Sequence, residues 1–195
     1  MQNNYFKNNS EHKELNIKNY FLSKTKTRGV NFYLSSLINV DITESELIDF
    51  EFVSSQLKNC NISNTELEKC YFKNSLITNS KATGTSFADG IIKNTKFKKS
   101  KLNLINFRFA DLENINFNDC ILTDANFQGV KLKNVSFINC DLKTADFSQA
   151  SFKNIDLRKS NIEGIKIEIN NFKELTIDPS QAVYIISLLG LTVAN

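Results

Sequence analysis

The sequence of 195 residues predicts an all-β solenoid, in which short strands wind into stacked parallel coils, with a short α-helical cap at the C-terminus. Three observations predict this fold class. A large apolar residue returns at every fifth position from Phe32 to Ile177, where only Ala82 is small. The position two residues earlier is small, and similar residues recur at a spacing of twenty. A period of five matches neither a helix nor simple strand alternation, so each unit must be a short extended piece plus a corner.

The first two observations define which side chains point inward. Residues two apart on an extended piece share a face, so the large residue and the small one before it both point to the interior. The remaining three positions of each unit are mostly polar, as a solvated rim requires. The small inward positions, with Phe50 as the exception, are Ser35, Val40, Ser45, Ser55, Cys60, Thr65, Cys70, Ser75, Ser80, Thr85, Gly90, Ala110, Ala125, Ala145 and Ala150.

The spacing of twenty shows how many units close one coil. Four five-residue sides make one turn, and successive coils stack as parallel strands about 4.8 Å apart. Asparagine suits the corners because it tolerates left-handed backbone geometry, and stacked amides can form a ladder. The repeating corner pairs are Lys73-Asn74, Lys93-Asn94, Glu113-Asn114, Lys133-Asn134 and Lys153-Asn154.

The chain divides into three parts. Residues 1–14 are predicted to form an N-terminal cap or a disordered arm, because the first coil exposes a strand edge that must be covered. Residues 15–178 are predicted to form the β-helix, in which the basic segment 23–29 lacks a large residue and is interpreted as a defective coil or a small loop. The N-terminus lacks the apolar core of a signal peptide and no segment is long enough to span a bilayer, so we expect a cytoplasmic protein without a membrane partner.

Residues 179–195 are predicted to form a C-terminal helix and dimerisation tail. Asp178 is a candidate N-cap, Pro179 suits the first helical position and Gly190 suits the position after the last turn. Apolar residues surround more than one face, so part of this surface has no place in a monomer. We therefore expect a homodimer through this helix; the alternative is a cap that buries only one face. The expected interface residues are Tyr184, Ile185, Ile186, Leu188 and Leu189.

Short triplets carry a family resemblance. Ala110-Asp111-Leu112, Ala125-Asn126-Phe127 and Ala145-Asp146-Phe147 resemble the repeat signature of pentapeptide-repeat proteins. That resemblance implies a right-handed quadrilateral parallel β-helix with a solid interior. The tail, with Gln181-Ala182, the apolar run and Leu189-Gly190-Leu191, resembles the C-terminal module of quinolone-resistance members of the Qnr and MfpA type. This second resemblance implies a dimer that binds DNA gyrase or topoisomerase IV by imitating DNA, with antibiotic resistance as the outcome.

Catalytic chemistry has few candidate residues. The only histidine, His12, falls in the N-terminal segment expected to be mobile, which argues against a histidine relay or metal cluster. The four cysteines occupy small inward positions, where they act as buried spacers. We therefore expect a non-enzymatic interaction scaffold without cofactor or metal.

The charged surface leaves the partner open. If the chain mimics DNA, its candidate acidic surface is the run Asp41, Glu44, Glu46, Asp49 and Glu51. The net charge of +3 argues against mimicry, because basic residues repel a DNA-binding surface. The alternative is a partner of unknown identity, an acidic protein or a nucleic acid, bound by the lysine column; direct nucleic-acid binding is disfavoured because no outward aromatics interleave the lysines. Lysine and asparagine columns that only keep the rod soluble are a third interpretation. The column contains Lys73, Lys93, Lys133, Lys153 and Lys173.

Overall fold

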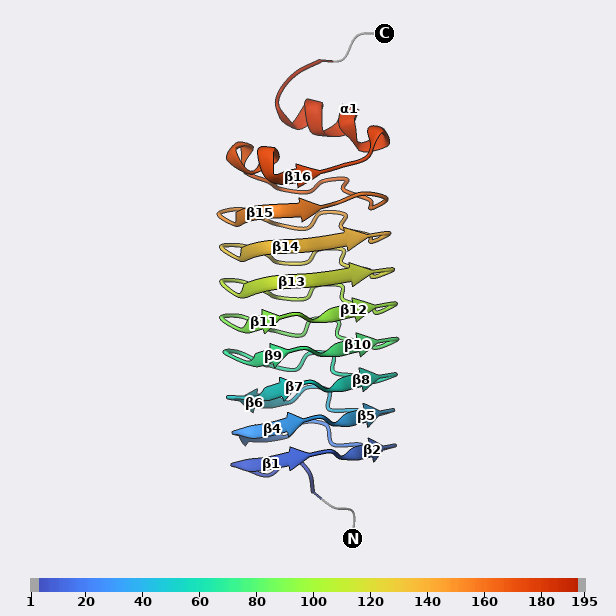
Figure 1. Ribbon diagram of the computed structural model, residues 1–195, viewed down its shortest axis with the longest axis vertical. Helices are drawn as coiled ribbons and strands as arrows, with labels where there is room; N and C mark the ends of the chain where they lie inside the picture. Colours follow the sequence, from blue (N-terminus) through green and yellow to red (C-terminus); the bar gives the residue numbers. More distant parts are fainter. Residues whose placement is uncertain (1–3, 193–195) are drawn as a thin grey trace.

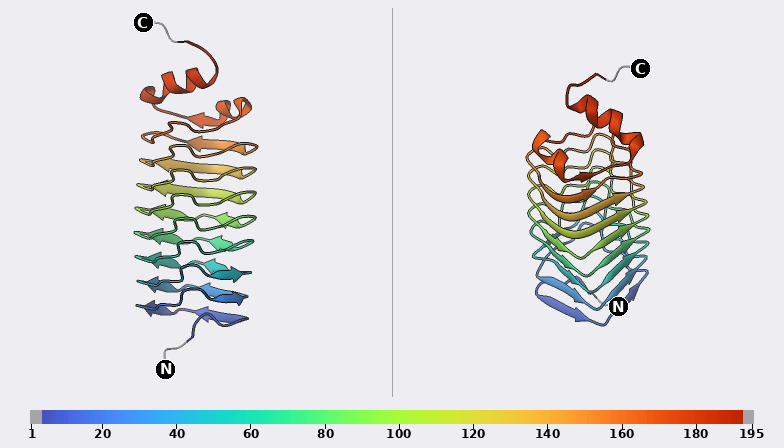
Figure 2. Two further views of the ribbon diagram at one scale, coloured as in Figure 1. Left: turned by 180° about the vertical axis from the view of Figure 1, so that it is seen from behind. Right: turned by 45° about the horizontal axis from the view of Figure 1, so that its top comes forward.

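The computed structural model describes residues 4–192, which form a right-handed quadrilateral parallel β-helix of about eight coils and a short C-terminal helix. The coils stack along one straight axis, with the two ends of the chain at opposite ends of the rod (Figure 1). Seen obliquely from the C-terminal end, each coil has four sides (Figure 2), and buried apolar side chains fill the interior. The fold class predicted from the period of five is confirmed.

We number the four faces in chain order by their inward residues: face 1 contains Phe32 and Phe52, face 2 Leu37 and Leu57, face 3 Ile42 and Ile62, and face 4 Leu47 and Leu67. Face 3 is held by isolated bridges such as Asp41 to Asn61. Face 1 carries β1 (Ser10–Lys13), β4 (Val30–Tyr33), β7 (Glu51–Val53), β9 (Tyr71–Lys73) and β11 (Ile91–Lys93). Face 2 carries β2 (Asn16–Lys18), β5 (Ser36–Ile38), β8 (Gln56–Lys58), β10 (Leu76–Thr78) and β12 (Lys96–Lys98). Face 4 carries β3 (Lys26–Arg28) and β6 (Glu46–Ile48), whereas β13 (Asp111–Asn118), β14 (Lys131–Ile138) and β15 (Ser151–Asp156) continue from face 1 to face 2.

The register places each residue on the one twenty positions later. Leu112 pairs with Leu132, and Phe117 pairs with Phe137. Identical rings therefore stack inside the rod, with centroids 4.8 Å apart for Phe97 and Phe117 and 4.9 Å apart for Phe117 and Phe137. Because each coil contacts only its neighbours, the core is a continuous column of apolar side chains rather than a central cluster.

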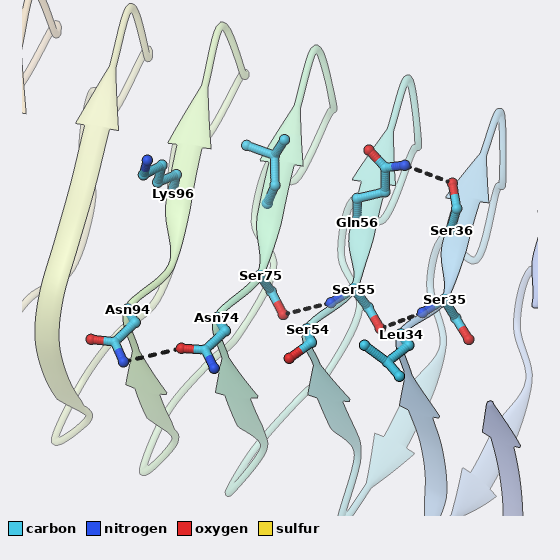
Figure 3. Close-up of a pocket in the computed structure, with 11 residues that line it drawn as sticks. Leu34, Ser35, Ser36, Ser54, Ser55, Gln56, Asn74, Ser75, Asn94 and Lys96 are labelled. Atoms are coloured by element: carbon cyan, nitrogen blue, oxygen red, sulfur yellow. Dashed lines mark hydrogen bonds between the residues drawn. The ribbon is translucent and has the colours of Figure 1, made fainter. Parts of the chain in front are cut away.

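The corners adopt left-handed backbone geometry. Asn74, Asn94 and Asn114 have φ of 51°, 49° and 56°, values that asparagine tolerates better than most side chains. Their amides form a ladder: Asn94 Nδ2 donates to Asn74 Oδ1 at 3.1 Å, and Asn114 Nδ2 donates to Asn94 Oδ1 at 2.9 Å. Figure 3 shows the first of these bonds beside the buried serines of the same edge. The asparagine columns thus stabilise the corners.

The N-terminal part joins the stack earlier than the sequence analysis expected. β1 pairs with β4 from Ser10 onward, and Phe6 is buried against the first coil. His12 is not in a mobile arm; it takes an inward position, where its ring lies 4.8 Å from that of Phe32 and its Nε2 is 2.6 Å from the carbonyl oxygen of Tyr5. Segment 23–29 is also a regular side of the helix, since the small Thr27 is buried where a large residue was missing.

The last coil departs from the repeat. The 3₁₀ helix η1 (Ile169–Glu174) replaces the face 1 strand, and β16 (Leu175–Thr176) then pairs with β15. Asn171 turns inward here, and its Nδ2 donates to the carbonyl oxygen of Ala150 at 2.9 Å. Helix α1 (Pro179–Leu188) follows and lies across the end of the rod (Figure 1).

Candidate interaction surfaces

Helix α1 closes the C-terminal end of the rod. Asp178 accepts a bond from Ser180 N–H, while its own N–H donates to Gln181 Oε1 at 3.0 Å, so the helix begins with a capping box. The Gln181 side chain is buried and donates to the carbonyl oxygens of Leu157 and Ser160, each at 2.7 Å. Within residues 4–192 the Ser160 carbonyl oxygen accepts no backbone N–H and is satisfied by this side chain, whereas the Leu157 carbonyl oxygen also accepts the N–H of Ser160 at 3.2 Å.

The five residues expected at a dimer interface lie in different environments. Ile185 is only 8% exposed and packs on the coil. Tyr184 is half-buried, and its Oη accepts the N–H of Gly164 at 2.6 Å. Ile186 is half-buried, whereas Leu188 and Leu189 are 37% and 41% exposed. Ile185 and Tyr184 therefore hold the helix on the rod, and Leu188 and Leu189 remain partly exposed.

Further apolar side chains surround this end. Val183 and Leu191 are 57% and 60% exposed, and Ile169 of η1 is 67% exposed. Two of these three residues lie in the apolar run 182–191, but none of them is among the interface residues that the sequence predicts. Together with Leu188 and Leu189 they form what we call the C-terminal apolar surface.

The acidic run does not form one patch. Its residues follow a single coil around three faces, because consecutive five-residue units turn at every corner. The preceding coil also supplies cations, since Glu44 pairs with Lys24 at 3.4 Å and Glu46 pairs with Lys26 at 2.8 Å. Two members are engaged by other groups: Asp49 accepts from Arg28, and Asp41 from Thr43 and Asn61. The basic segment 23–29 thus covers much of the charge of the acidic run.

Glu51 of this run raises the pKa of a neighbouring tyrosine, Tyr33. The Tyr33 hydroxyl donates to Glu51 Oε2 at 2.6 Å, and this bond, with partial burial, raises the pKa of Tyr33 to about 12. The phenol therefore stays protonated and holds the carboxylate on face 1.

The stack brings other carboxylates together on face 4. Glu66 lies directly beside Glu46, and Glu68 lines the same shallow hollow of about 260 Å³. Sequence analysis missed Glu66 and Glu68, but the spacing of twenty between positions 46 and 66 was the available signal. Lys69 is the cation nearest to them in the lining of the hollow.

Four members of the lysine column, Lys73, Lys93, Lys133 and Lys153, lie on face 1 as their spacing predicts. The fifth, Lys173, lies instead in η1, which replaces the face 1 strand of the last coil. Lys93 pairs with Lys73 and with Glu113, and Lys133 pairs with Glu113 and Lys153, in the strand register. Glu113 binds both of its neighbours, with Oε1 2.5 Å from the Lys133 Nζ and Oε2 3.5 Å from the Lys93 Nζ. The bond with Lys133 lowers the pKa of Glu113 and raises that of Lys133. One carboxylate therefore compensates part of the column.

A groove of about 560 Å³ follows the corner between faces 1 and 2. Its polar groups bind one another: Gln56 Nε2 donates to Ser36 Oγ at 3.0 Å, and the N–H of Ser35 donates to Ser55 Oγ at 2.9 Å (Figure 3). The groove therefore presents few free donors, and it does not resemble a catalytic pocket.

Reactive groups within residues 4–192 are sparse. No group of three or more His, Cys, Asp or Glu residues in this range is arranged to hold a metal ion. All four cysteines are free and buried, and burial raises the pKa of the Cys60 and Cys70 thiols. None of the helices in this range is long and apolar enough to cross a membrane.

The chain is similar to several known proteins. It shares 19% identity with a trypsin-treated form of QnrB1, a plasmid-mediated fluoroquinolone resistance protein, over 95% of this chain and 100% of that one, with a TM-score of 0.46. It shares 15% identity with HetL, involved in heterocyst differentiation regulation in the cyanobacterium Nostoc sp. strain PCC 7120, over 84% and 87% of the chains, with a TM-score of 0.49. No curated protein matches the sequence. A family model described as a pentapeptide repeat region matches residues 30–107, 50–127 and 106–183. With its five-residue period, four-sided coils and this match, the chain belongs to the pentapeptide-repeat family.

Proposed function

We propose that the chain is a non-enzymatic interaction scaffold that forms a homodimer through the C-terminal apolar surface, and that the dimer binds a type II topoisomerase. The observation that carries this proposal is the exposure of Val183, Leu188, Leu189 and Leu191 at one end of a rod whose faces are mostly polar. Several exposed large apolar side chains at one end of a polar rod are typical of a protein interface.

A second copy of the chain is the partner that suits this end best. A two-fold axis across the end of the rod would bring the same residues of both copies together, as in most homodimers. In this arrangement Leu188 and Leu189 contact the partner, while Tyr184 and Ile185 fix the helix on its own coil. The contacts of Tyr184 and Ile185 with the coil support the dimer, because they fix the helix on the rod while Leu188 and Leu189 stay partly exposed for a partner.

The topoisomerase part of the proposal comes from the resemblance of the tail to quinolone-resistance proteins. Glu66 and Glu68 on face 4, which lie beside the ion-paired Glu46, are the acidic group that the stack best concentrates for such a partner. The run 41–51 contributes less than its composition suggests, since Lys24, Lys26 and Arg28 pair with three of its members. The lysine column supports the alternative of an acidic partner, weakened by the pairing of Glu113 with Lys93 and Lys133.

Two experiments test the two parts separately. Sedimentation equilibrium should give a dimer for the wild-type chain and folded monomers for Leu188→Lys. Ser54→Lys is the matched control, because it adds the same charge at an exposed corner of the kind that Lys69 and Lys99 occupy elsewhere. Wild-type protein that sediments as a monomer would remove the dimer from the proposal.

The partner is tested by gyrase supercoiling, titrated with and without a fluoroquinolone, beside the same titration on DNA alone. Inhibition or protection from the drug below the protein concentrations that shift DNA is the expected result, and it should weaken in Glu66→Lys/Glu68→Lys. Activity unchanged by micromolar protein would reject the topoisomerase and leave the family fold with another partner.

A further inference from the structure

A second basic surface lies around the corner between faces 2 and 3, in the middle of the rod. Its side chains come from both faces and from the corner itself, and all are exposed. Strand spacing of about 4.8 Å places the residues of neighbouring coils side by side, as for Lys81 and Lys101. We call this the lysine cluster, and its members are Lys58, Lys81, Lys96, Lys98, Lys99 and Lys101.

A trough runs along this corner, parallel to the axis of the rod. It has a volume of about 490 Å³, and its floor is formed by the buried Cys60 and Ser80. The corner column that ends at Lys99 and the face 3 column that ends at Lys81 and Lys101 form its walls. The remaining wall residues are amide side chains, namely Asn59, Asn61 and Asn79. Three lysines and three amides therefore line the same depression, although the Asn59 and Asn61 amides donate to Asn39 and Asp41 of the preceding coil.

The lysine cluster has no internal compensation. Among residues 4–192, none of its six members forms an ion pair within 4.0 Å, in contrast to Lys93 and Lys133 on face 1. Asp119 lies one coil beyond Lys99, and its carboxylate accepts the amide of Asn139 and forms no ion pair with Lys99. Lys81 and Lys101 lie directly opposite one another, and like charges in that relation destabilise a sheet. An anionic partner would relieve this repulsion.

From these observations we infer that the lysine cluster binds the phosphate backbone of double-stranded nucleic acid. Charge density selects this partner over an acidic peptide. Duplex DNA carries about one charge per 1.7 Å of its axis, so several phosphates lie within reach of the roughly 10–15 Å that the cluster spans. An extended peptide places side chains on one face only about every 6.6 Å, so it presents two or three carboxylates over that length.

The composition of the cluster also indicates how the duplex is held. Lysine acts as a point charge, and neither arginine nor an aromatic side chain lines the trough. Base edges and exposed bases therefore have no fitted partner, so binding is independent of sequence and prefers duplex to single strands.

The test is fluorescence anisotropy with a labelled 20-base-pair duplex across a range of salt concentrations. The test variant is Lys81→Gln/Lys99→Gln/Lys101→Gln, and the matched control is Lys73→Gln/Lys153→Gln/Lys173→Gln, which removes the same charge from face 1. Each lost phosphate contact should lower the slope of log K against log salt by about 0.9, so the test variant should lose about 2.7. By counterion release alone this is roughly a hundredfold weaker binding at 0.15 M salt, whereas the control should change binding less than about threefold.

Three results would overturn the inference. The wild-type chain could fail to bind the duplex even at 50 mM salt, or the two triple variants could weaken binding equally, which would mean that only net charge matters. Polyglutamate could also compete as well as the duplex at equal charge, which would assign the cluster to an acidic protein. Thermal melting of both variants checks that they remain folded, so that a smaller salt dependence of binding cannot result from unfolding.

Discussion

Truncating one stacked ring of the core should lower the free energy of unfolding far more than truncating an exposed ring on the neighbouring coil. The Phe127 side chain is fully buried, with its ring centroid 4.5 Å from that of Phe147 and 5.2 Å from that of Phe107. Its edge also meets Phe137 at 5.7 Å. Truncation of a buried Phe to Ala costs about 3–5 kcal/mol, and we expect the upper half of this range because neighbouring strands cannot close the gap.

The matched control is Phe109→Ala, which truncates the same residue type at a corner. Phe109 is 51% exposed, and the Arg108 guanidinium lies 4.6 Å from its ring centroid. Its loss should cost at most about 1 kcal/mol. Urea unfolding followed by circular dichroism measures both variants. A Phe127→Ala cost below about 1.5 kcal/mol, or one equal to that of Phe109→Ala, would contradict the stacked-column account of stability.

Three further outcomes follow from single sites. Gly129→Ala should cost about 1–2 kcal/mol in urea unfolding, since Gly129 has φ +64° and an added Cβ would lie 2.4 Å from Phe109 Cδ1; in a Phe109→Ala background only the backbone strain should remain. Partial burial alone would raise the pKa of Asp146, but hydrogen bonds from neighbouring side chains and backbone lower it to about 2. The folded pKa is thus below the unfolded value near 4, so about 1–2 kcal/mol of stability is present above pH 4 and is lost as pH falls toward 2; Asp146→Asn should flatten that limb of the stability profile. Alkaline titration followed by tyrosine absorbance should show Tyr33 ionising near pH 12, and Glu51→Gln should return it toward ordinary tyrosines.

The fold was predictable because the repeat fixes both inward columns at once. A one-unit error in register would place Phe117 beside a residue other than Phe137, and no such ambiguity exists when the period holds from residue 32 to 177. The helix boundaries were predictable for a similar reason, since Asp178 and Pro179 act through local backbone chemistry. His12 and Thr27 take inward positions that elsewhere hold a large apolar residue, so the repeat pattern did not predict that their segments belong to regular coils.

The interaction surfaces were less predictable because they depend on which side chains meet after folding. Charge counted along the chain suggested an acidic patch at 41–51, yet those carboxylates turn around three faces and meet Lys24, Lys26 and Arg28. The lysine cluster was only partly visible in the sequence, because Lys96, Lys98, Lys99 and Lys101 are close along the chain whereas Lys58 and Lys81 join them only through the stack. Comparing residues twenty positions apart reveals both the pairing of the acidic run and the gathering of the lysines. The trough between two columns can be seen only in the three-dimensional structure.

Because all coils have the same height, distances along the axis of the rod change in steps of one coil. Every side chain on the rod is displaced by one strand spacing, about 4.8 Å, for each twenty residues inserted below it. The Asn114 to Asn134 amide bond and the Leu112 to Leu132 pairing show how little one coil differs from the next where it joins its neighbours. Duplicating residues 111–130 would therefore lengthen the rod by a single step and move the C-terminal apolar surface away from the lysine cluster without changing either. The distance between two surfaces of this protein can therefore change during evolution only in steps of one coil, by insertion or deletion of twenty residues.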